Sequence, residues 1–548
     1  MAAVLLKLST DLNVMALNYV VMNGELYACH PPLRQVLGLQ LEQGAVVKKY
    51  RKGMTRVALL YPSTYEAALS SLVYHRLYFT LNDMENVYVE RFFLRSPGGP
   101  PEPLRGYEGG APLRSFDFIV APIHYELDYA NLARALLGSG VPVLSRERTS
   151  PKVIVGGPAP TANPEPIADM VDAVVMGELE ASQGWLEGVL NEGMSIEPAE
   201  AVYVPAEGKH EVRVGYSASV PRGDLRRIRA PEASFSIAVE VARGCPFPCA
   251  FCLEGHITKP FRTRPASEVI EEAEGLYKLY GLRVALVSLT ANASPWFKDI
   301  VRGLVTRGVP FSVPSLRAEL LDEESIDLLA RAGQLTLTLA PEASERLREA
   351  LGKLAKDEDF VRAARLAASK GMKVKLYALV GVPGETIDDL RAFAELTRRM
   401  ATSGVRLELS VNPLVIKPQT PLQWLPMLPE DELNLRIRAA RDLYAYERFS
   451  YYDPFEALVQ GSLSLGDRDT LKYIVEVARD GVGRGSWRRA TSRGLLSIAL
   501  RPRRSPLPWS HVKGPFDEKV LAERLRAYLE RVPEARALLA QAPPGQDA

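Results

Sequence analysis

The stretch Arg243-Gly244-Cys245-Pro246-Phe247-Pro248-Cys249-Ala250-Phe251-Cys252 holds three of the four cysteines in a chain of 548 residues. It follows an apolar, strand-like run over residues 236–242. Gly244, Pro246 and Pro248 interrupt regular structure, so we expect the cysteines on a loop after a strand. Such a loop lets three thiolates converge, and thiolates are ligands of iron–sulfur clusters and of zinc.

The lack of a fourth cysteine nearby leaves two kinds of metal site open. A structural zinc site is closed by four ligands, and His256 could complete a Cys3His set. A cubane cluster held by three cysteines instead keeps one iron open for another molecule. A disulfide is disfavoured, because pairing Cys249 with Cys252 would leave Cys245 without a partner.

The spacing Cys-x-x-x-Cys-x-x-Cys, with the aromatic Phe251 before the last cysteine, resembles the radical S-adenosylmethionine (SAM) superfamily. The resemblance implies that Cys245, Cys249 and Cys252 bind three irons of a 4Fe-4S cluster, with Phe251 beside the cofactor. The fourth iron would chelate the amino and carboxylate groups of SAM. One electron, from a donor such as ferredoxin or flavodoxin, would then cleave SAM to methionine and a 5′-deoxyadenosyl radical.

The composition is that of a globular protein, with 47% apolar and 24% charged residues and a formal charge of +1. The length predicts two to four domains. No run of 18 apolar residues and no signal sequence is evident, so we expect a cytoplasmic protein without a membrane span. The fourth cysteine, Cys29, we interpret as a small buried or half-buried thiol rather than a ligand.

Short apolar runs alternate with helical segments after an N-terminal extension of no clear class, residues 1–54. Over residues 55–190 this alternation predicts a doubly wound, Rossmann-like parallel sheet in an α/β fold. The expected strands cover residues 57–61, 86–93, 116–121, 153–157 and 173–177.

This domain resembles the cobalamin-binding-like domain that precedes many radical SAM barrels, on the segments 153–158 and 172–178. Gly156 and Gly157 would let a cofactor approach the backbone at a strand's carboxyl edge, or would only form a tight turn. The motif Asp-x-His-x-x-Gly is missing, since the chain reads Tyr-Pro-Ser-Thr-Tyr-Glu over residues 61–66. Two alternatives stay open: cobalamin binds without a histidine ligand, or the domain keeps the shape without the cofactor.

Residues 191–234 alternate weakly, which predicts a hairpin and linker. Residues 235–430 then repeat strand and helix six times, as in the partial (β/α)6 TIM-type barrel of the radical SAM fold. The expected strands cover residues 237–241, 283–289, 310–314, 335–339, 373–380 and 406–413. Active sites of such barrels lie at the carboxyl ends of the strands.

Segments 312–317, 339–348, 375–386 and 412–424 resemble an uncharacterised radical SAM group that has this type of N-terminal domain. The resemblance is collinear over roughly residues 55–430. Arg317 and Glu342 are candidate SAM ligands because they lie at expected strand ends, and Lys375 is a further candidate within the fifth strand segment. Arg317 and Lys375 would pair with the SAM carboxylate, and Glu342 with the ribose hydroxyls or the ammonium. The alternative for each is an ion pair at the rim of the barrel.

Two further pairs complete the predicted cofactor site. Many radical SAM proteins have Gly-Gly-Glu after the second strand, where this chain has the hydroxyls of Ser288 and Thr290 to hold the SAM ammonium. Gly381 and Gly384 lie in a tight loop whose backbone could lie against adenine.

Residues 431–548 form a mostly helical, basic C-terminal region. Between Asp480 and Asp517 it carries eight positive side chains and no carboxylate, with Trp487 and Trp509 interleaved. This stretch is either a patch for the phosphate of RNA, a nucleotide or a lipid, or a solvated face paired with carboxylates elsewhere, which we favour. The tail, residues 541–548, is expected to be disordered.

The favoured hypothesis is a radical SAM enzyme that acts by a 5′-deoxyadenosyl radical; one form of it uses cobalamin as a methyl carrier to an unactivated carbon. One alternative is a radical SAM enzyme without cobalamin, such as a methylthiotransferase-like modifier of RNA or protein. That chemistry typically takes three more cysteines upstream, where only Cys29 exists. The other alternative is a non-catalytic iron–sulfur or zinc protein.

Overall fold

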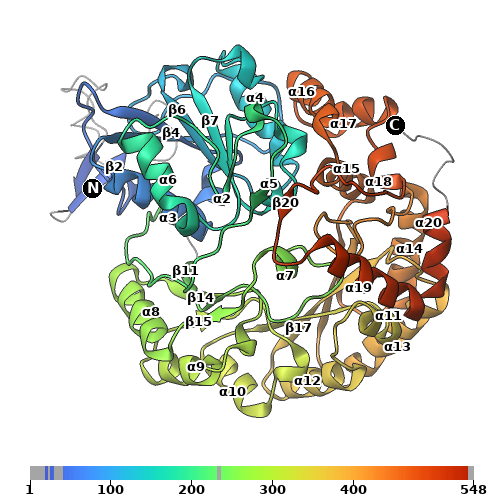
Figure 1. Ribbon diagram of the computed structural model, residues 1–548. Helices are drawn as coiled ribbons and strands as arrows, with labels where there is room; N and C mark the ends of the chain where they lie inside the picture. Colours follow the sequence, from blue (N-terminus) through green and yellow to red (C-terminus); the bar gives the residue numbers. More distant parts are fainter. Residues whose placement is uncertain (1–18, 23–24, 30–40, 231–235, 541–548) are drawn as a thin grey trace.

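The computed structural model describes residues 19–22, 25–29, 41–230 and 236–540. The N-terminal residues include a small antiparallel sheet of β1 (Tyr19–Met22), β2 (Glu25–Cys29) and β3 (Leu41–Glu42). A Rossmann-like domain, a curved half-barrel and a C-terminal helical region follow, and the helical region reaches both other parts (Figure 1). The Cys29 side chain and the tail 541–548 lie outside what is described.

The Rossmann-like sheet has the strand order β5-β4-β6-β7-β8-β9. All neighbouring strands are parallel except β9, which is antiparallel to β8. The doubly wound prediction is therefore confirmed. The strands are β4 (Thr55–Tyr61), β5 (Val87–Phe93), β6 (Phe118–Pro122), β7 (Lys152–Gly156), β8 (Ala173–Val175) and β9 (Val202–Tyr203).

Both faces of this sheet are covered because its strands are apolar on both sides. Along β4, Val57 and Leu59 belong to one core, with α3 (Leu72–Asp83) and α6 (Leu179–Asn191). Ala58 and Leu60 belong to the other core, with α4 (Asp128–Gly138) and the C-terminal α16 (Leu471–Arg479). The C-terminal region is thus part of this domain's core, which the sequence did not reveal.

The predicted hairpin of residues 191–234 is wrong in its pairing. Two short strands form, but β9 extends the Rossmann-like sheet, and β10 (Val212–Arg213) pairs with β20 (Val512–Lys513) of the C-terminal region. The alternation in the sequence reflects the burial of Val202, Val212 and Val214 against other parts of the chain.

The half-barrel consists of two parallel sheets, β11-β14-β15 and β16-β17-β18-β19. All six predicted strands are present, and β19 is an unpredicted seventh. The Gln334 side chain spans the gap between the sheets, with bonds to the Val313 amide (2.8 Å) and the Thr336 carbonyl (3.0 Å). The strands are β11 (Ser236–Glu240), β14 (Arg283–Val287), β15 (Phe311–Ser312), β16 (Thr336–Glu342), β17 (Lys373–Val380), β18 (Leu407–Pro413) and β19 (Arg448–Tyr451).

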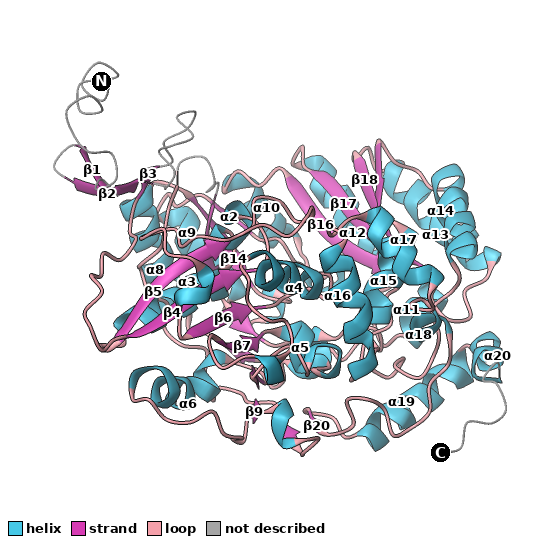
Figure 2. Ribbon diagram, turned by 90° about the horizontal axis from the view of Figure 1, so that it is seen from above, coloured by secondary structure: helices cyan, strands magenta, loops and turns pink. Residues whose placement is uncertain are grey.

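Alternation along the strands separates the outer core from the interior of the half-barrel. In β17, Val374, Leu376, Ala378 and Val380 are buried, whereas the residues between them are only half-buried. The buried side chains share one core with residues of the outer helices, and Figure 2 shows these helices alongside the strands. These helices are α8 (Ala266–Tyr280), α9 (Phe297–Thr306), α10 (Glu323–Arg331), α12 (Asp357–Ser369), α13 (Ile387–Ala401) and α14 (Glu430–Leu443).

The C-terminal region is mostly helical, as predicted. Its remaining helices are α15 (Pro454–Ser464), α17 (Arg484–Ser492), α18 (Ser497–Leu500), α19 (Glu518–Arg531) and α20 (Ala537–Ala540). Short helices elsewhere are α2 (Tyr65–Leu69), α5 (Pro158–Ala162), α7 (Glu254–Ile257) and α11 (Glu345–Ala350). Within the described ranges, no helix has the length and apolar character needed to cross a membrane.

Candidate active site

The cysteine motif forms a loop at the carboxyl end of β11, as predicted. The loop is enclosed by two short antiparallel strands, β12 (Ala242–Arg243) and β13 (Arg262–Thr263). Gly244 has a φ of 78°, and a Cβ there would lie 2.3 Å from the Thr258 carbonyl oxygen, so only glycine fits. All three cysteines are free thiols, and Cys245 and Cys249 are buried.

The geometry argues against a closed zinc site. Both ring nitrogens of His256 are engaged: Nδ1 lies 2.8 Å from the Cys252 carbonyl oxygen, and Nε2 accepts from Arg524 at 2.9 Å. Among the described residues, no three His, Cys, Asp or Glu side chains are arranged around a single ion. A cubane places a separate iron at each thiolate, so the three-cysteine loop fits a cluster better than one ion.

Positive side chains surround the cysteine loop. Burial raises the pKa of the Cys249 thiol, and the positive charges of Lys353 and Arg317 oppose that rise. Burial also raises the pKa of Cys252, to about 12. Arg524 donates a hydrogen bond to the Pro248 carbonyl of the loop. These cations suit a site whose thiolates are deprotonated when metal binds.

The predicted SAM ligands Arg317 and Glu342 lie at this loop, and both also form the ion pairs of the alternative interpretation. The Arg317 guanidinium stacks 3.7 Å from the centre of the Phe247 ring and pairs with Glu319 at 2.5 Å. Glu342 pairs with Lys353 at 2.8 Å. The backbone of Glu342 is left-handed, with a φ of 64°. This conformation costs a residue other than glycine about 1–3 kcal/mol, and residues with such strain cluster at functional sites. The role of Arg317 and Glu342 in SAM binding stays a prediction.

Lys353 was not identified as a candidate site residue from the sequence. It lies in the loop that follows α11. Two residues earlier, the Leu351 carbonyl accepts a 2.8 Å hydrogen bond from the Ala250 amide of the cysteine loop. No local signal marks such a lysine, because its place depends on contacts between distant segments.

The other predicted residues divide into those near the cysteines and those elsewhere. Thr290 Oγ1 lies 3.5 Å from Cys245 Sγ, and the Thr290 amide donates to Ser288 Oγ. Phe251 packs, half-buried, against the core below the loop. Lys375 instead lies near the amino end of β17, with its Nζ 5.0 Å from the centre of the Tyr377 ring. Its position does not match a residue at the strand's carboxyl end.

The predicted adenine loop is covered in part by the C-terminal region. A Cβ at Gly384 would lie 2.4 Å from Val532 Cγ1, and Tyr528 donates to the Pro383 carbonyl at 2.6 Å. Gly381 also has a positive φ, and its amide donates to Glu385 at 2.8 Å. Packing thus explains Gly384, and the contact of this loop with adenine stays a prediction.

A cavity of about 520 Å³ lies between the carboxyl ends of the Rossmann-like strands and the cysteine loop. Gly156 and Gly157 line it from one domain, and Gly244, Glu254 and Ser288 from the other. Most of the remaining lining is apolar. Its size and composition suit a cofactor or substrate. The structure therefore brings together residues that the sequence assigned to separate domains.

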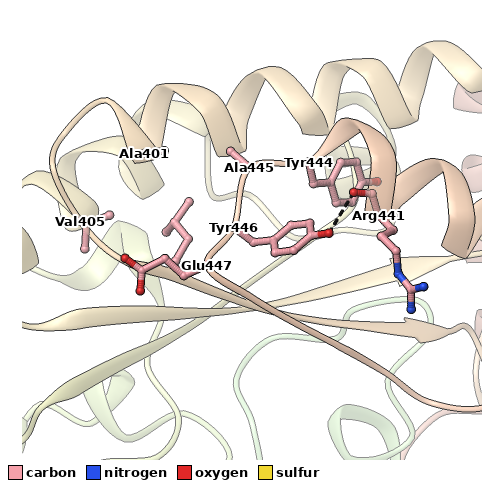
Figure 3. A pocket seen from close by; sticks show the side chains of 8 residues that line it. Ala401, Val405, Arg441, Tyr444, Ala445, Tyr446 and Glu447 are labelled. Carbon is pink, nitrogen blue, oxygen red and sulfur yellow. Dashed lines mark hydrogen bonds between the residues drawn. The ribbon is translucent and has the colours of Figure 1, made fainter.

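A second hollow, of about 600 Å³, is formed around Arg441, Tyr446 and Glu447 (Figure 3). It lies near Leu407 and Glu447, before the amino ends of β18 and β19. Because barrel chemistry takes place at the carboxyl ends of the strands, the interdomain cavity is the better candidate for the active site.

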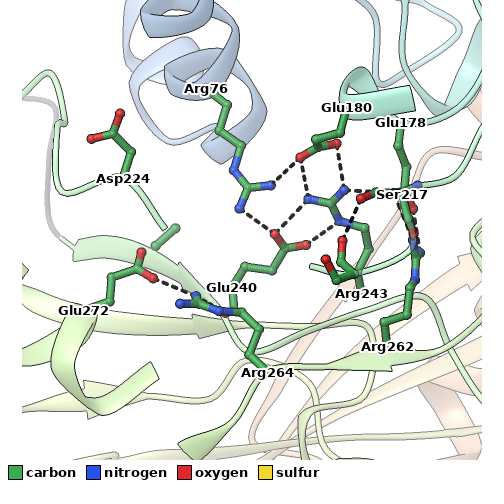
Figure 4. Close-up of polar contacts among 12 residues, drawn as sticks. Arg76, Glu178, Glu180, Ser217, Asp224, Glu240, Arg243, Arg262, Arg264 and Glu272 are labelled. Carbon is green, nitrogen blue, oxygen red and sulfur yellow. Dashed lines mark hydrogen bonds and ion pairs between the residues drawn. The ribbon is translucent and has the colours of Figure 1, made fainter. Parts of the chain in front are cut away.

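Buried ion pairs join the two domains along one wall of that cavity (Figure 4). Glu178 accepts from Arg262 at 2.5 Å and from Arg243 at 3.0 Å, and Arg243 also pairs with Glu180 and Glu240. Burial acts to raise the pKa of Glu180 and Glu240, but both pKa values are lowered, chiefly by the hydrogen bonds from Arg243. Arg243 and Arg262 flank the cysteine loop, so this network fixes the loop to the Rossmann-like domain.

The basic C-terminal stretch is largely paired, as favoured from the sequence. Its ion pairs are Arg484–Asp453, Arg488–Glu430, Arg489–Asp480 and Arg493–Glu476. Arg503 is bonded to backbone carbonyls. Trp487 and Trp509 are buried, so neither offers a surface on which a base could stack.

Fold and site together define a radical SAM protein. Residues 73–195 match the family model for radical SAM proteins, N-terminal, and residues 239–397 match the radical SAM superfamily model. An uncharacterized protein of Methanocaldococcus jannaschii is 30% identical over 434 residues, which cover 77% of this chain and 91% of the relative. The chain therefore belongs to the radical SAM superfamily.

Two further similarities have lower sequence identity. A ribosomal protein uS12 methylthiotransferase of Pelotomaculum thermopropionicum is 24% identical over 242 residues, covering 41% of this chain and 53% of that protein. The structure of TsrM from Kitasatospora setae, a radical SAM methyltransferase with cobalamin and a [4Fe-4S] cluster bound, is 17% identical. It covers 80% of this chain and all of TsrM with a TM-score of 0.52, which supports the shared fold.

Proposed function

We propose that this radical SAM enzyme binds a 4Fe-4S cluster at Cys245, Cys249 and Cys252 and a cobalamin in the interdomain cavity, and transfers a methyl group to an unactivated carbon. The observation that carries the proposal is the position of the cavity, which has the cysteine loop on one side and Gly156 and Gly157 on the other. The cluster would supply the electron that cleaves SAM, and cobalamin would carry the methyl group.

The chain's own residues fit these groups. Three free thiols that follow one another on the loop match a cubane with one open iron. The Gly156 and Gly157 backbones border the cavity at the carboxyl edge of the sheet, where doubly wound domains bind ligands. Apolar side chains such as Leu72, Val120 and Ile154 would keep water from the reacting groups.

The methylthiotransferase alternative is less well supported. The matching methylthiotransferase covers less than half of this chain. The second cluster of that chemistry would take three more cysteines, and only Cys29 remains.

A cobalamin-retention assay tests the proposal. The protein is reconstituted anaerobically with iron and sulfide, incubated with hydroxocobalamin, and freed of unbound cofactor by gel filtration. We expect about one cobalamin per chain, and a Gly156→Leu variant, whose side chain would enter the cavity, should retain little. A wild-type protein that binds iron and SAM but retains no cobalamin would refute the methyl-carrier proposal and leave a radical SAM enzyme without cobalamin.

A further inference from the structure

Helix α19 of the C-terminal region lies beside α7, the short helix that follows the cysteine loop (Figure 1). Arg524 of α19 donates a hydrogen bond to the Pro248 carbonyl oxygen, directly before Cys249. Its Nη1 also lies 2.9 Å from Nε2 of His256, a residue of α7. The Nδ1 atom of His256 lies 2.8 Å from the Cys252 carbonyl oxygen. The arginine therefore holds the segment 249–252 at both ends, once directly and once through the imidazole.

The hydrogen bonds of His256 show which group carries the positive charge. A guanidinium only donates hydrogen bonds, so Nε2 of His256 accepts from Arg524 and carries no proton. The imidazole is then neutral, and its Nδ1–H donates to the Cys252 carbonyl oxygen. The positive charge in this chain of contacts therefore belongs to Arg524.

Arg524 has no carboxylate partner among the residues that the structure describes. Burial lowers the pKa of Arg524, and the charge of Cys249 acts against this change. Lys259 also forms no ion pair within the described ranges, but no hydrogen bond to the loop fixes its charge in place. Three other cations at the loop are neutralised, in the ion pairs Arg243–Glu178, Arg317–Glu319 and Lys353–Glu342.

A positive charge fixed beside the cysteines acts on a cluster that they bind. Reduction adds one negative charge to the cluster, so a nearby cation stabilises the reduced form and makes reduction easier. Arg524 is half-buried, and salt water screens such a charge less than it screens an exposed one. Its contacts with the loop keep the charge at a fixed place beside the thiolates.

We propose that Arg524 is a positioning residue of the cysteine loop and that its unpaired charge raises the reduction potential of the 4Fe-4S cluster. The proposal rests on the proposed function, since it requires a cluster at the three cysteines, but it does not require a corrinoid. The electron itself would come from a one-electron donor protein of the ferredoxin or flavodoxin class. The C-terminal region thus takes part in the reductive step without supplying a cluster ligand.

A redox titration of the anaerobically reconstituted protein, followed by electron paramagnetic resonance of the reduced cluster, tests the proposal. Arg524→Gln removes the charge but keeps N–H donors, and its midpoint should shift to a more negative potential. Arg524→Lys keeps the charge and should remain closer to the wild-type midpoint. Arg526→Met removes an exposed arginine of the same helix and should leave the midpoint unchanged.

A second measurement leaves Arg524 in place, in case its replacement releases the cluster. Val520 is 37% exposed and lies one helical turn before Arg524, so a glutamate there can pair with the arginine. Val520→Glu should therefore have a more negative midpoint than the matched variant Val520→Gln, whose new side chain is uncharged. Equal midpoints in these two variants would contradict the proposal.

The outcomes separate the role of Arg524 from the proposed function. If the cluster of Arg524→Gln keeps the wild-type midpoint, or if Arg524→Gln and Arg524→Lys shift it equally, the role of the charge is refuted while the cluster stands. A wild-type protein that binds no iron would refute the cluster of the proposed function and this role together.

Discussion

Replacing Glu178 by glutamine removes one charge from the wall between the domains. In the native protein, this carboxylate accepts from Arg262, Arg243 and the Ser217 amide, and the Glu178 and Arg262 side chains are only 11% and 8% exposed. Arg243 keeps Glu180 and Glu240 as partners. Arg262 forms no other ion pair among the described residues.

The expected cost of Glu178→Gln therefore comes mainly from Arg262, which loses its carboxylate partner while Arg243 keeps two. Leaving a buried charge without its partner costs about 3–5 kcal/mol. We expect Glu178→Gln to lower the midpoint of urea unfolding clearly and to release iron from the reconstituted protein sooner under a chelator, because Arg243 and Arg262 flank the cysteine loop. The matched control is Glu271→Gln, whose partner Arg222 is 71% exposed, and which should change stability by less than about 1 kcal/mol.

A double-mutant cycle sharpens the test. Removing both charges, in Glu178→Gln with Arg262→Gln, should cost less than the sum of the two single variants, since no buried charge is then unpaired. Two results would refute the role of Glu178 in holding the loop. One is an unfolding free-energy cost of the double variant equal to the sum of the two single costs. The other is a Glu178→Gln variant that is as stable as Glu271→Gln and loses iron at the same rate.

Two further predictions concern SAM and the C-terminal region. Glu342→Gln and Arg317→Ala should each weaken SAM binding about ten- to a hundredfold at unchanged iron content, since each loses a charge-assisted hydrogen bond of roughly 1.5–3 kcal/mol. Calorimetric titration with SAM checks this. If both variants bind SAM with normal affinity and only unfold at a lower temperature, the two residues are rim ion pairs. Gly384→Ala should destabilise the protein more than Gly371→Ala in thermal unfolding, because both glycines have positive φ but only Gly384 lacks room for a Cβ, against Val532; equal costs would mean that this packing does not matter.

Local patterns made much of the fold predictable. The five parallel strands of the first sheet and the six of the half-barrel are short apolar runs bounded by turn residues, and period and spacing are local properties of a sequence. The cysteine loop was predictable for the same reason, since its three cysteines lie within eight residues. The pairing of β10 with β20 was not, because it joins segments three hundred residues apart.

The parts of the site that escaped prediction depend on contacts between domains. Glu178 and Lys353 belong to segments without a local signal. Glu178 acquires its role when the Rossmann-like domain meets Arg243 and Arg262 beside the cysteine loop, and Lys353 when the loop after α11 meets Cys249. Lys375 lies in the expected strand 373–380, and the structure accordingly places it near the amino end of β17, away from the carboxyl edge.

The most direct test of the central claim is the spectrum of the reduced, anaerobically reconstituted protein with and without SAM. We predict a 4Fe-4S signal that changes when SAM is added, because the fourth iron is open to it, and 5′-deoxyadenosine as a product. Alanine at Cys245, Cys249 or Cys252 should abolish both, whereas Cys29→Ala should leave them intact. A wild-type protein that binds zinc but no iron, or a cluster whose spectrum SAM does not alter, would contradict the account.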